Sequence, residues 1–213
     1  MIKILLTAFE PFGNDRENAA AIVCHQIPSQ GEGYQIEKRI LPTEFTAGAA
    51  ALMQAMDEVQ PEMVLCLGQA GGRKYVTPER VAINLMDGPI PDNCGYQPDE
   101  VEIIPGGPAA YLTNVPVKAV VKQAHEAGYP VQVSNSAGLY VCNCIFYTLM
   151  NRIAYTPANE AVPAVWGDFI HVPYLKEQQG IPEEMPALPT AQVVETVSNL
   201  IQQLVQCKLS LQL

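Results

Sequence analysis

Cys142 lies at the start of a predicted helix, after a predicted strand and a tight turn, within residues 129–150. The apolar run 129–133 favours the strand, and from about Tyr140 apolar residues recur every four positions, as in a helix. In a first helical turn, free N–H groups and the helix dipole lower a thiol pKa from about 8.5. Because the thiolate is the nucleophilic form, Cys142 is a candidate nucleophile. The alternative interpretation is that Cys142 and Cys144 are small buried apolar residues.

A cysteine nucleophile needs a base, and histidine is the usual base near neutral pH. Of the three histidines, His25 and His125 fall in predicted helices, whereas His171 ends the predicted strand 164–172. Ligands of open α/β sheets bind at the carboxyl ends of strands, where the predicted strand before Cys142 also ends. Cys142 and His171 are therefore predicted to meet at one sheet edge. The alternative is that His171 has only a structural role.

A third polar group usually orients the histidine in such a site. The candidate acids in the sequence are Glu79, Asp87, Asp92 and Asp168. Asp168 lies only three residues before His171 on the same predicted strand, which makes it an awkward partner. Glu79 precedes the predicted strand 80–85 and is equally compatible with an exposed loop acid. Spacing alone does not choose among the four.

The composition is that of a globular, acidic protein. The 213 residues suffice for one large domain, 48% of them are hydrophobic, and no apolar run reaches the ~18 residues of a membrane span. A net charge of −10 argues against nucleic-acid or anionic-membrane binding, which needs clustered basic residues. The N-terminal residues lack the features of a signal peptide, so we expect a cytoplasmic location. The six cysteines are expected to be free thiols, and a C-x-C pair is weak evidence for zinc.

Predicted strands and helices alternate along the chain. The strands are expected over 1–9, 34–41, 62–68, 80–85, 129–133 and 164–172, and the helices over 17–27, 43–60 (with Thr43 as N-cap), 116–127, from 140, and from 190. Residues 87–107 are predicted to be irregular and to cover the surface or a site, and 155–163 to form a loop. This order predicts a three-layer α/β/α sandwich around a largely parallel, mixed sheet, with 1–213 as a single domain.

Eight blocks of sequence, in order, resemble a known family. They are TAFEPFG (7–13), LPTEF (41–45), LGQAGGR (67–73), PERVAINL (78–85), IPDN (90–93), GPAAY (107–111), SNSAGLYVCN (134–143) and FIHVPYL (169–175). Together they resemble the pyroglutamyl peptidase I, or pyrrolidone carboxyl peptidase, family of cysteine peptidases. The resemblance covers most of the chain and is more specific than any single motif.

The resemblance implies a triad of Cys142, His171 and Glu79, and so selects the acid that spacing left open. It implies removal of an N-terminal pyroglutamyl (5-oxoprolyl) residue from peptides through a thioester, with no cofactor and no metal. The N–H groups around Cys142 and the loop after Leu67 are candidates for the oxyanion hole. Family members are commonly homotetramers, so a homo-oligomer is expected.

The pocket for a neutral lactam should have apolar walls and a few amide hydrogen bonds. By resemblance, the substrate-binding residues are Phe9, Phe12, Thr43, Gln69, Ile90, Tyr140 and Val141. Position alone favours plain core packing for Phe9 and Phe12, and Thr43 could equally be only a helix cap.

One position departs from the family pattern. Many members carry an arginine immediately before the IPDN block, where this sequence has Pro89. A first alternative function is therefore a catalytically weakened binder of pyroglutamyl N-termini. A second is a nucleoside phosphorylase-like enzyme, which would need a phosphate-binding set among Arg16, Arg39, Arg73, Arg80 and Arg152, and nothing in the sequence singles these out.

Overall fold

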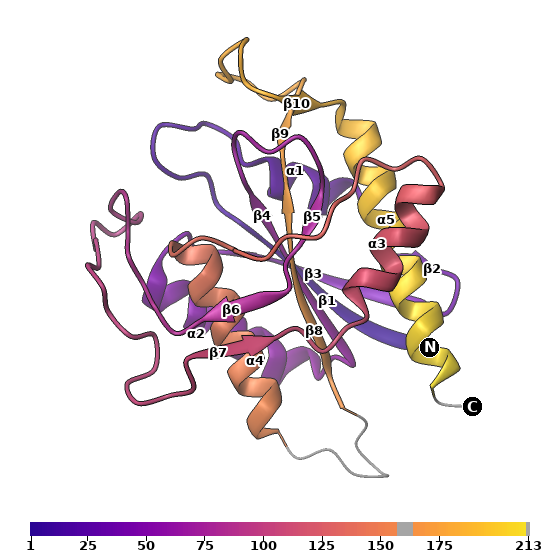
Figure 1. The fold of residues 1–213 in the computed structure, drawn as a ribbon, viewed down its shortest axis with the longest axis horizontal. Coiled ribbons are helices and arrows are strands. Elements are labelled where there is room, and N and C mark those ends of the chain that lie inside the picture. The colour runs from indigo at the N-terminus through magenta and orange to yellow at the C-terminus, as the bar shows by residue number, and fades with distance from the viewer. Residues whose placement is uncertain (157–163, 212–213) are drawn as a thin grey trace.

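A mixed sheet lies between two layers of helices in the computed structural model, which describes residues 1–156 and 164–211 (Figure 1). Six strands of these described residues follow the order β2-β3-β1-β4-β8-β5. The parallel strands are β3 (Tyr34–Leu41), β1 (Ile2–Phe9), β4 (Met63–Gln69) and β8 (Trp166–Val172), and the short antiparallel edges are β2 (Gln30–Gly31) and β5 (Thr77–Pro78). The predicted α/β sandwich is confirmed.

Both faces of the central strands are buried, because helices cover each face. One hydrophobic core joins the sheet to α1 (Ala19–Gln26), α3 (Val117–Glu126) and α5 (Thr190–Ser210). The other core joins it to α2 (Phe45–Val59) and α4 (Val141–Tyr155), which lie together on the opposite side (Figure 1). Alternate residues of one strand divide between the two cores: Ile4 belongs to the first and Leu5 to the second.

Two pairs of short strands lie outside the main sheet. β6 (Val81–Ile83) pairs with β7 (Ala110–Leu112) beside α4, and β9 (Tyr174–Leu175) pairs with β10 (Ala187–Leu188). The chain between β6 and β7 is largely irregular, as predicted for 87–107. Within the described part of the chain, no helix is both long and apolar enough to cross a bilayer.

The predicted strand 129–133 is wrong. This segment makes isolated parallel bridges, Val76 with Val131 and Glu79 with Ser134, instead of a continuous ladder. Prolines explain the interruption, because Pro78 and Pro130 have no N–H to donate and can only accept, from Ser134 and Val76 respectively. The segment still runs beside residues 76–80 and thereby brings the turn before α4 next to Glu79.

Several predicted boundaries move by a few residues, and the predicted cap of α2 is wrong. Glu44, not Thr43, is the N-cap residue. The N–H of Phe45 donates to Oδ2 of Asp92, a residue of the irregular segment, at a distance of 3.0 Å. The Thr43 hydroxyl instead donates to the carbonyl of Glu10 at 2.7 Å. Of the predicted loop 155–163, Tyr155 ends α4 and residues 157–163 lie outside the described residues.

Replacing Asp92 by alanine should destabilise the fold, because this buried carboxylate also accepts from the N–H groups of Cys94 (3.1 Å) and Tyr96 (2.9 Å). Loss of a capping carboxylate together with its loop contacts should lower the free energy of unfolding by about 2 kcal/mol. Urea denaturation at pH 7 measures the change, with the exposed Asp99→Ala as the matched control. Equal stability of the two variants would contradict the role assigned to Asp92.

Candidate active site

The carboxyl ends of three parallel strands and the N-terminus of α4 meet at one edge of the sheet. β1 ends at Phe9, β4 at Gln69, and His171 is the penultimate residue of β8. Cys142 is the second residue of α4. All four line one cavity of about 410 Å³, so the predicted convergence of Cys142 and His171 at a sheet edge is confirmed.

Most of the predicted pocket residues line this cavity as well. They are Phe9, Phe12, Thr43, Gln69, Tyr140 and Val141. The rings of Phe12 and Tyr140 lie 5.9 Å apart, and the Tyr140 hydroxyl donates to the carbonyl of Pro91 at 3.0 Å. Ile90 differs, because it is not among the described lining residues and is 40% exposed, whereas its neighbour Pro89 does line the cavity.

Glu79 is the acid that contacts the imidazole. Its Oε1 lies 2.7 Å from Nδ1 of His171, and both side chains are buried. Two of the other candidates are placed elsewhere: Asp92 accepts from the N–H of Phe45 at the start of α2, and Asp168 is buried within β8, where burial raises the pKa of its carboxyl well above its ordinary value. The hydrogen bond fixes the proton on Nδ1 and leaves Nε2 as the free acceptor.

Cys142 is half-buried in the first turn of α4, as predicted, beside strand β4. Gly68 makes room for it: a Cβ at this position would lie 3.1 Å from Cys142 Sγ and 2.7 Å from the ring of Phe169. Gly68 is also the partner of His171 in the β4–β8 pairing. Gly68 therefore lets the thiol of Cys142 pack against β4 at the position that is paired with His171 of β8.

The predicted lowering of the Cys142 pKa is wrong. Burial, reinforced by the negative charge of Glu79, raises the pKa of this thiol to about 12, and the smaller opposing effects of Arg73 and its own N–H do not compensate. Desolvation thus outweighs the helix terminus. Burial also lowers the pKa of His171. At neutral pH the resting site therefore holds a neutral thiol and a neutral imidazole.

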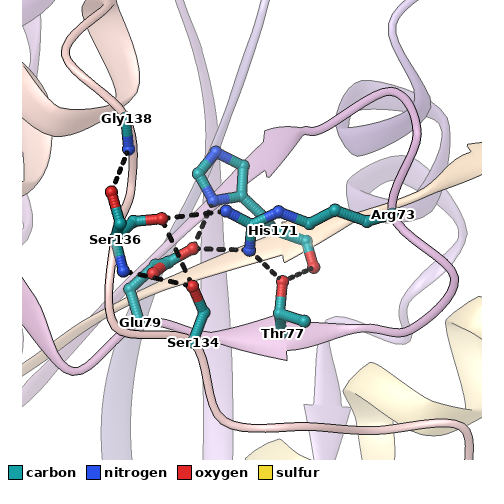
Figure 2. A network of polar contacts seen from close by, with 7 residues as sticks. All are labelled: Arg73, Thr77, Glu79, Ser134, Ser136, Gly138 and His171. Carbon is teal, nitrogen blue, oxygen red and sulfur yellow. Dashed lines mark hydrogen bonds and ion pairs between the residues drawn. The ribbon is translucent and has the colours of Figure 1, made fainter.

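Glu79 stays ionised between two donors. Burial by itself raises the pKa of this carboxyl, but the hydrogen bond with His171 and the charge of Arg73 hold that pKa below its ordinary value. Arg73 Nη1 lies 2.7 Å from Glu79 Oε1, the oxygen that also contacts His171 (Figure 2). Among the residues that the structure describes, Glu79 Oε2 has no hydrogen-bond partner.

Arg73 and Asn18 line the cavity without having been predicted as site residues. Asn18 is buried, caps α1 and donates to the carbonyl of Glu10 at 3.1 Å. The available signal was position: Arg73 lies between Gln69 and Glu79, two residues already assigned to the site, and Asn18 follows the loop that carries Phe12.

The Gln69 side chain joins three segments beneath the cavity. Its Oε1 accepts from the N–H of Ala19 and from Gln178 Nε2, both at 2.8 Å, and its Nε2 donates to Asp15 Oδ2 at 2.7 Å. The amide therefore fixes the loop after β1 and the turn after β9 to the end of β4. The loop fixed in this way carries Phe12, which lines the cavity.

The other chemistries considered from sequence find no support in the contacts. Arg39 and Arg152 pair with the adjacent carboxylates Glu58 and Asp57 of α2, whereas Arg73 pairs with Glu79 at the cavity, so the charges of these three arginines are already matched by carboxylates. Cys144 packs with its Sγ 3.7 Å from the carbonyl of Phe45. In residues 1–156 and 164–211, no three side chains of His, Cys, Asp or Glu gather in a way that could hold a metal.

A thiol at a helix N-terminus and an imidazole held by a carboxylate, both lining one cavity, are the components of a cysteine peptidase site. Comparison with known proteins narrows this class. The chain matches the pyroglutamyl peptidase family over residues 2–207. It therefore belongs to the pyroglutamyl peptidase family.

Individual relatives agree with this assignment over nearly their whole length. The chain is 40% identical to the pyrrolidone-carboxylate peptidase of Bacillus cytotoxicus, covering 95% of this chain and 92% of that protein. It is 48% identical to the enzyme of Yersinia pestis over 84% of this chain and 81% of that one. The crystal structure of pyroglutamyl peptidase I from Bacillus amyloliquefaciens superposes with a TM-score of 0.87 at 38% identity, covering 97% of this chain and 98% of that one.

Replacing Gly68 by alanine should slow alkylation of Cys142 by iodoacetamide, because the new methyl group would occupy the space beside Sγ. Overpacking should also lower the free energy of unfolding by about 1–3 kcal/mol. Mass spectrometry of the peptide containing Cys142 measures the alkylation rate. Gly167→Ala is the control, because its Cβ would lie 2.4 Å from Ile153, on the same sheet but away from the sulfur. An alkylation rate that falls equally in both variants would contradict the assignment.

Proposed function

We propose that this chain is a cysteine exopeptidase that removes N-terminal pyroglutamyl residues from peptides, with Cys142 as nucleophile, His171 as base and Glu79 as the orienting acid. The observation that carries the proposal is the 2.7 Å contact between Glu79 and His171, at a cavity that Cys142 also lines. Membership of the pyroglutamyl peptidase family supplies the substrate class.

The reaction begins when Cys142 Sγ attacks the carbonyl carbon that links the pyroglutamyl residue to the rest of the peptide. The thiol proton passes to His171 Nε2, and the carbonyl oxygen takes the negative charge. When this intermediate collapses, the C–N bond breaks and His171 returns the proton to the leaving amine. Water, deprotonated by the same imidazole, then cleaves the thioester to release pyroglutamate and regenerate the thiol.

The neutral resting states of Cys142 and His171 determine how the thiol is activated. Because burial raises the pKa of Cys142 to about 12, the free thiolate is scarce, and the proton must move to His171 as the sulfur attacks. The imidazolium formed then lies against the Glu79 carboxylate, whose pKa is held low. Glu79 thereby stabilises the charge that appears only during the reaction.

The oxyanion is proposed to form next to the N-terminus of α4. A helix leaves the N–H groups of its first turn without helical partners, and those of Val141, Cys142 and Asn143 belong to this turn. The loop after β4, which includes Gly71, lines the same cavity. Backbone donors of this kind need no charged side chain, which is consistent with proline at position 89.

The cavity fits the chemistry of a neutral lactam. Its walls include Phe9, Phe12 and Tyr140, and its polar groups include Thr43 and Asn18. Of the described residues that line it, only Arg73 carries a permanent charge, and this charge is already paired with Glu79. An uncharged ring with one amide is therefore better suited to this pocket than a free N-terminal ammonium group.

In the Cys142→Ala variant, the rate of fluorophore release from a pyroglutamyl conjugate should fall by about 10⁴-fold or more, since removing the nucleophile disables the whole triad. Cys144→Ala, two residues along the same helix, should keep the activity, because that sulfur packs against α2. Wild-type protein that releases no fluorophore, yet binds pyroglutamate in calorimetry, would identify a binder and contradict the enzyme assignment.

We also propose that 1–213 is one catalytic domain that acts in the cytoplasm and assembles into a homo-oligomer, specifically a homotetramer. Support for assembly comes from large apolar side chains that face outward in the segment between β6 and β7: Ile90, Tyr96 and Val101 are each about 40% exposed. Such side chains, close together in one segment, are typical of surfaces that a neighbouring subunit covers.

Sedimentation velocity tests the assembly. From the family resemblance we expect a species of four times the chain mass of 23.2 kDa. Closed homo-oligomers bury the same patch on every copy, so one substitution in that patch acts at every interface. Val101→Glu should shift the distribution towards smaller species, with the exposed Asp99→Glu as the control. A wild-type protein that sediments as a monomer over the micromolar range would refute this part of the proposal.

A further inference from the structure

Arg73 connects the acid of the proposed triad to the turn that precedes the nucleophile. Nη1 lies 2.7 Å from Glu79 Oε1 and also contacts Thr77 Oγ1, while Nη2 donates to the carbonyl of Ser136 at 3.0 Å (Figure 2). We propose that Arg73 is a positioning residue of the catalytic site, which fixes Glu79 against His171 and ties both to the turn before Cys142. This inference rests on the proposed function.

The contacts require the planar fork of an arginine. One guanidinium nitrogen holds the carboxylate and the other holds a carbonyl on a different segment, which a single ammonium group cannot reproduce. The Arg73 side chain is 25% exposed, whereas Glu79 is fully buried, so the ion pair is shielded from solvent on one side. Without Arg73, Glu79 would keep His171 as the one partner of Oε1, with none for Oε2 among the described residues, and the link from this acid to the turn before Cys142 would be lost.

Backbone hydrogen bonds fix the two ends of this turn, from Ser134 N–H to Pro78 (2.9 Å) and from Asp87 N–H to Leu139 (3.1 Å). Between these ends the turn has longer side-chain contacts, among them one from the Ser134 hydroxyl to the Ser136 carbonyl at 3.2 Å. Ser134 Oγ accepts from the N–H of Ser136 at 3.3 Å, and Ser136 Oγ accepts from the N–H of Gly138 at 3.3 Å. Gly138 has a φ of 76°, in the left-handed region that favours glycine, and it lines the cavity four residues before Cys142. The Ser136 carbonyl is therefore the point at which the triad acid and the start of α4 are linked.

The charge of Arg73 also affects the pKa values of two groups in the site, His171 and Cys142. The charged or titratable groups that face His171 are Glu79 from the end of β5, Arg73 from the loop after β4, and Cys142 from α4. Burial lowers the pKa of His171 most, Glu79 opposes this effect, and the charge of Arg73 lowers it further. The charge of Arg73 also lowers the pKa of Cys142. Removal of that charge should therefore raise the pKa of both groups.

Three variants separate fork, charge and general structure. Arg73→Met removes both the fork and the charge, and Arg73→Lys removes the fork alone. Arg80→Met is the matched control, because Arg80 follows Glu79 directly, is exposed, and makes no ion pair with any residue that the structure describes. Each variant is characterised by kcat and KM on a pyroglutamyl fluorophore conjugate, by the pH dependence of kcat/KM, and by NMR titration of the three histidines.

For Arg73→Met we expect kcat to fall by about 100-fold, the cost of a misplacement of about 1 Å in a catalytic group, with KM little changed. The acid limb of kcat/KM should move to higher pH, because a His171 with a raised pKa stays protonated, and inactive as a base, to a higher pH. Arg73→Lys should lose kcat while keeping the wild-type acid limb. Arg80→Met should match the wild type in both.

An Arg73→Met protein with the wild-type acid limb and the wild-type His171 titration would overturn the proposal, as would Arg73→Lys with full kcat. If Arg73→Met does not fold, the loss of kcat in Arg73→Lys decides alone. The NMR titration needs no turnover, with His171 assigned by the His171→Gln variant. Wild-type protein without activity would therefore refute the proposed function, yet a raised His171 pKa in Arg73→Met would still support the contact.

Discussion

The buried contact between Glu79 and His171 is the constraint on which the site depends. A carboxylate with no exposure is tolerated only when donors surround it, and here His171 and Arg73 share a single oxygen. That requirement fixes the end of β8, the edge strand β5 and the loop after β4 relative to one another. The imidazole tautomer, the direction of its free nitrogen and the cavity beside Cys142 all follow from this one arrangement.

The helix that carries Cys142 contributes position more than activation. Its first turn places Val141 and Cys142 at the cavity, but burial, together with the charge of Glu79, makes the thiol pKa higher, not lower, than that of a free cysteine. In the proposed mechanism the proton therefore moves at the moment of attack, and the same burial lowers the pKa of the base, His171. Electrostatic stabilisation is reserved for the charged states that form during the reaction.

Local patterns in the sequence predicted the sandwich, the position of Cys142 in a first helical turn and its meeting with His171, because strand and helix periodicity records which elements are buried. Contacts between distant segments were not predictable in this way. Glu79 and His171 are 92 residues apart, and only family resemblance selected that acid. Asp92 replaces Thr43 at the start of α2 for a similar reason: an irregular segment with no periodicity supplies the partner. Arg73 was missed because its role depends on a partner, Ser136, that is 63 residues away in the sequence.

The protonated resting state of Cys142 has a consequence for survival of the protein between turnovers. Peroxides and disulfides react with thiolates far faster than with thiols, so a cysteine that ionises only while substrate is being attacked is protected from sulfenic acid formation when idle. The burial that makes Cys142 depend on a base for ionisation would thus also slow oxidation of its sulfur.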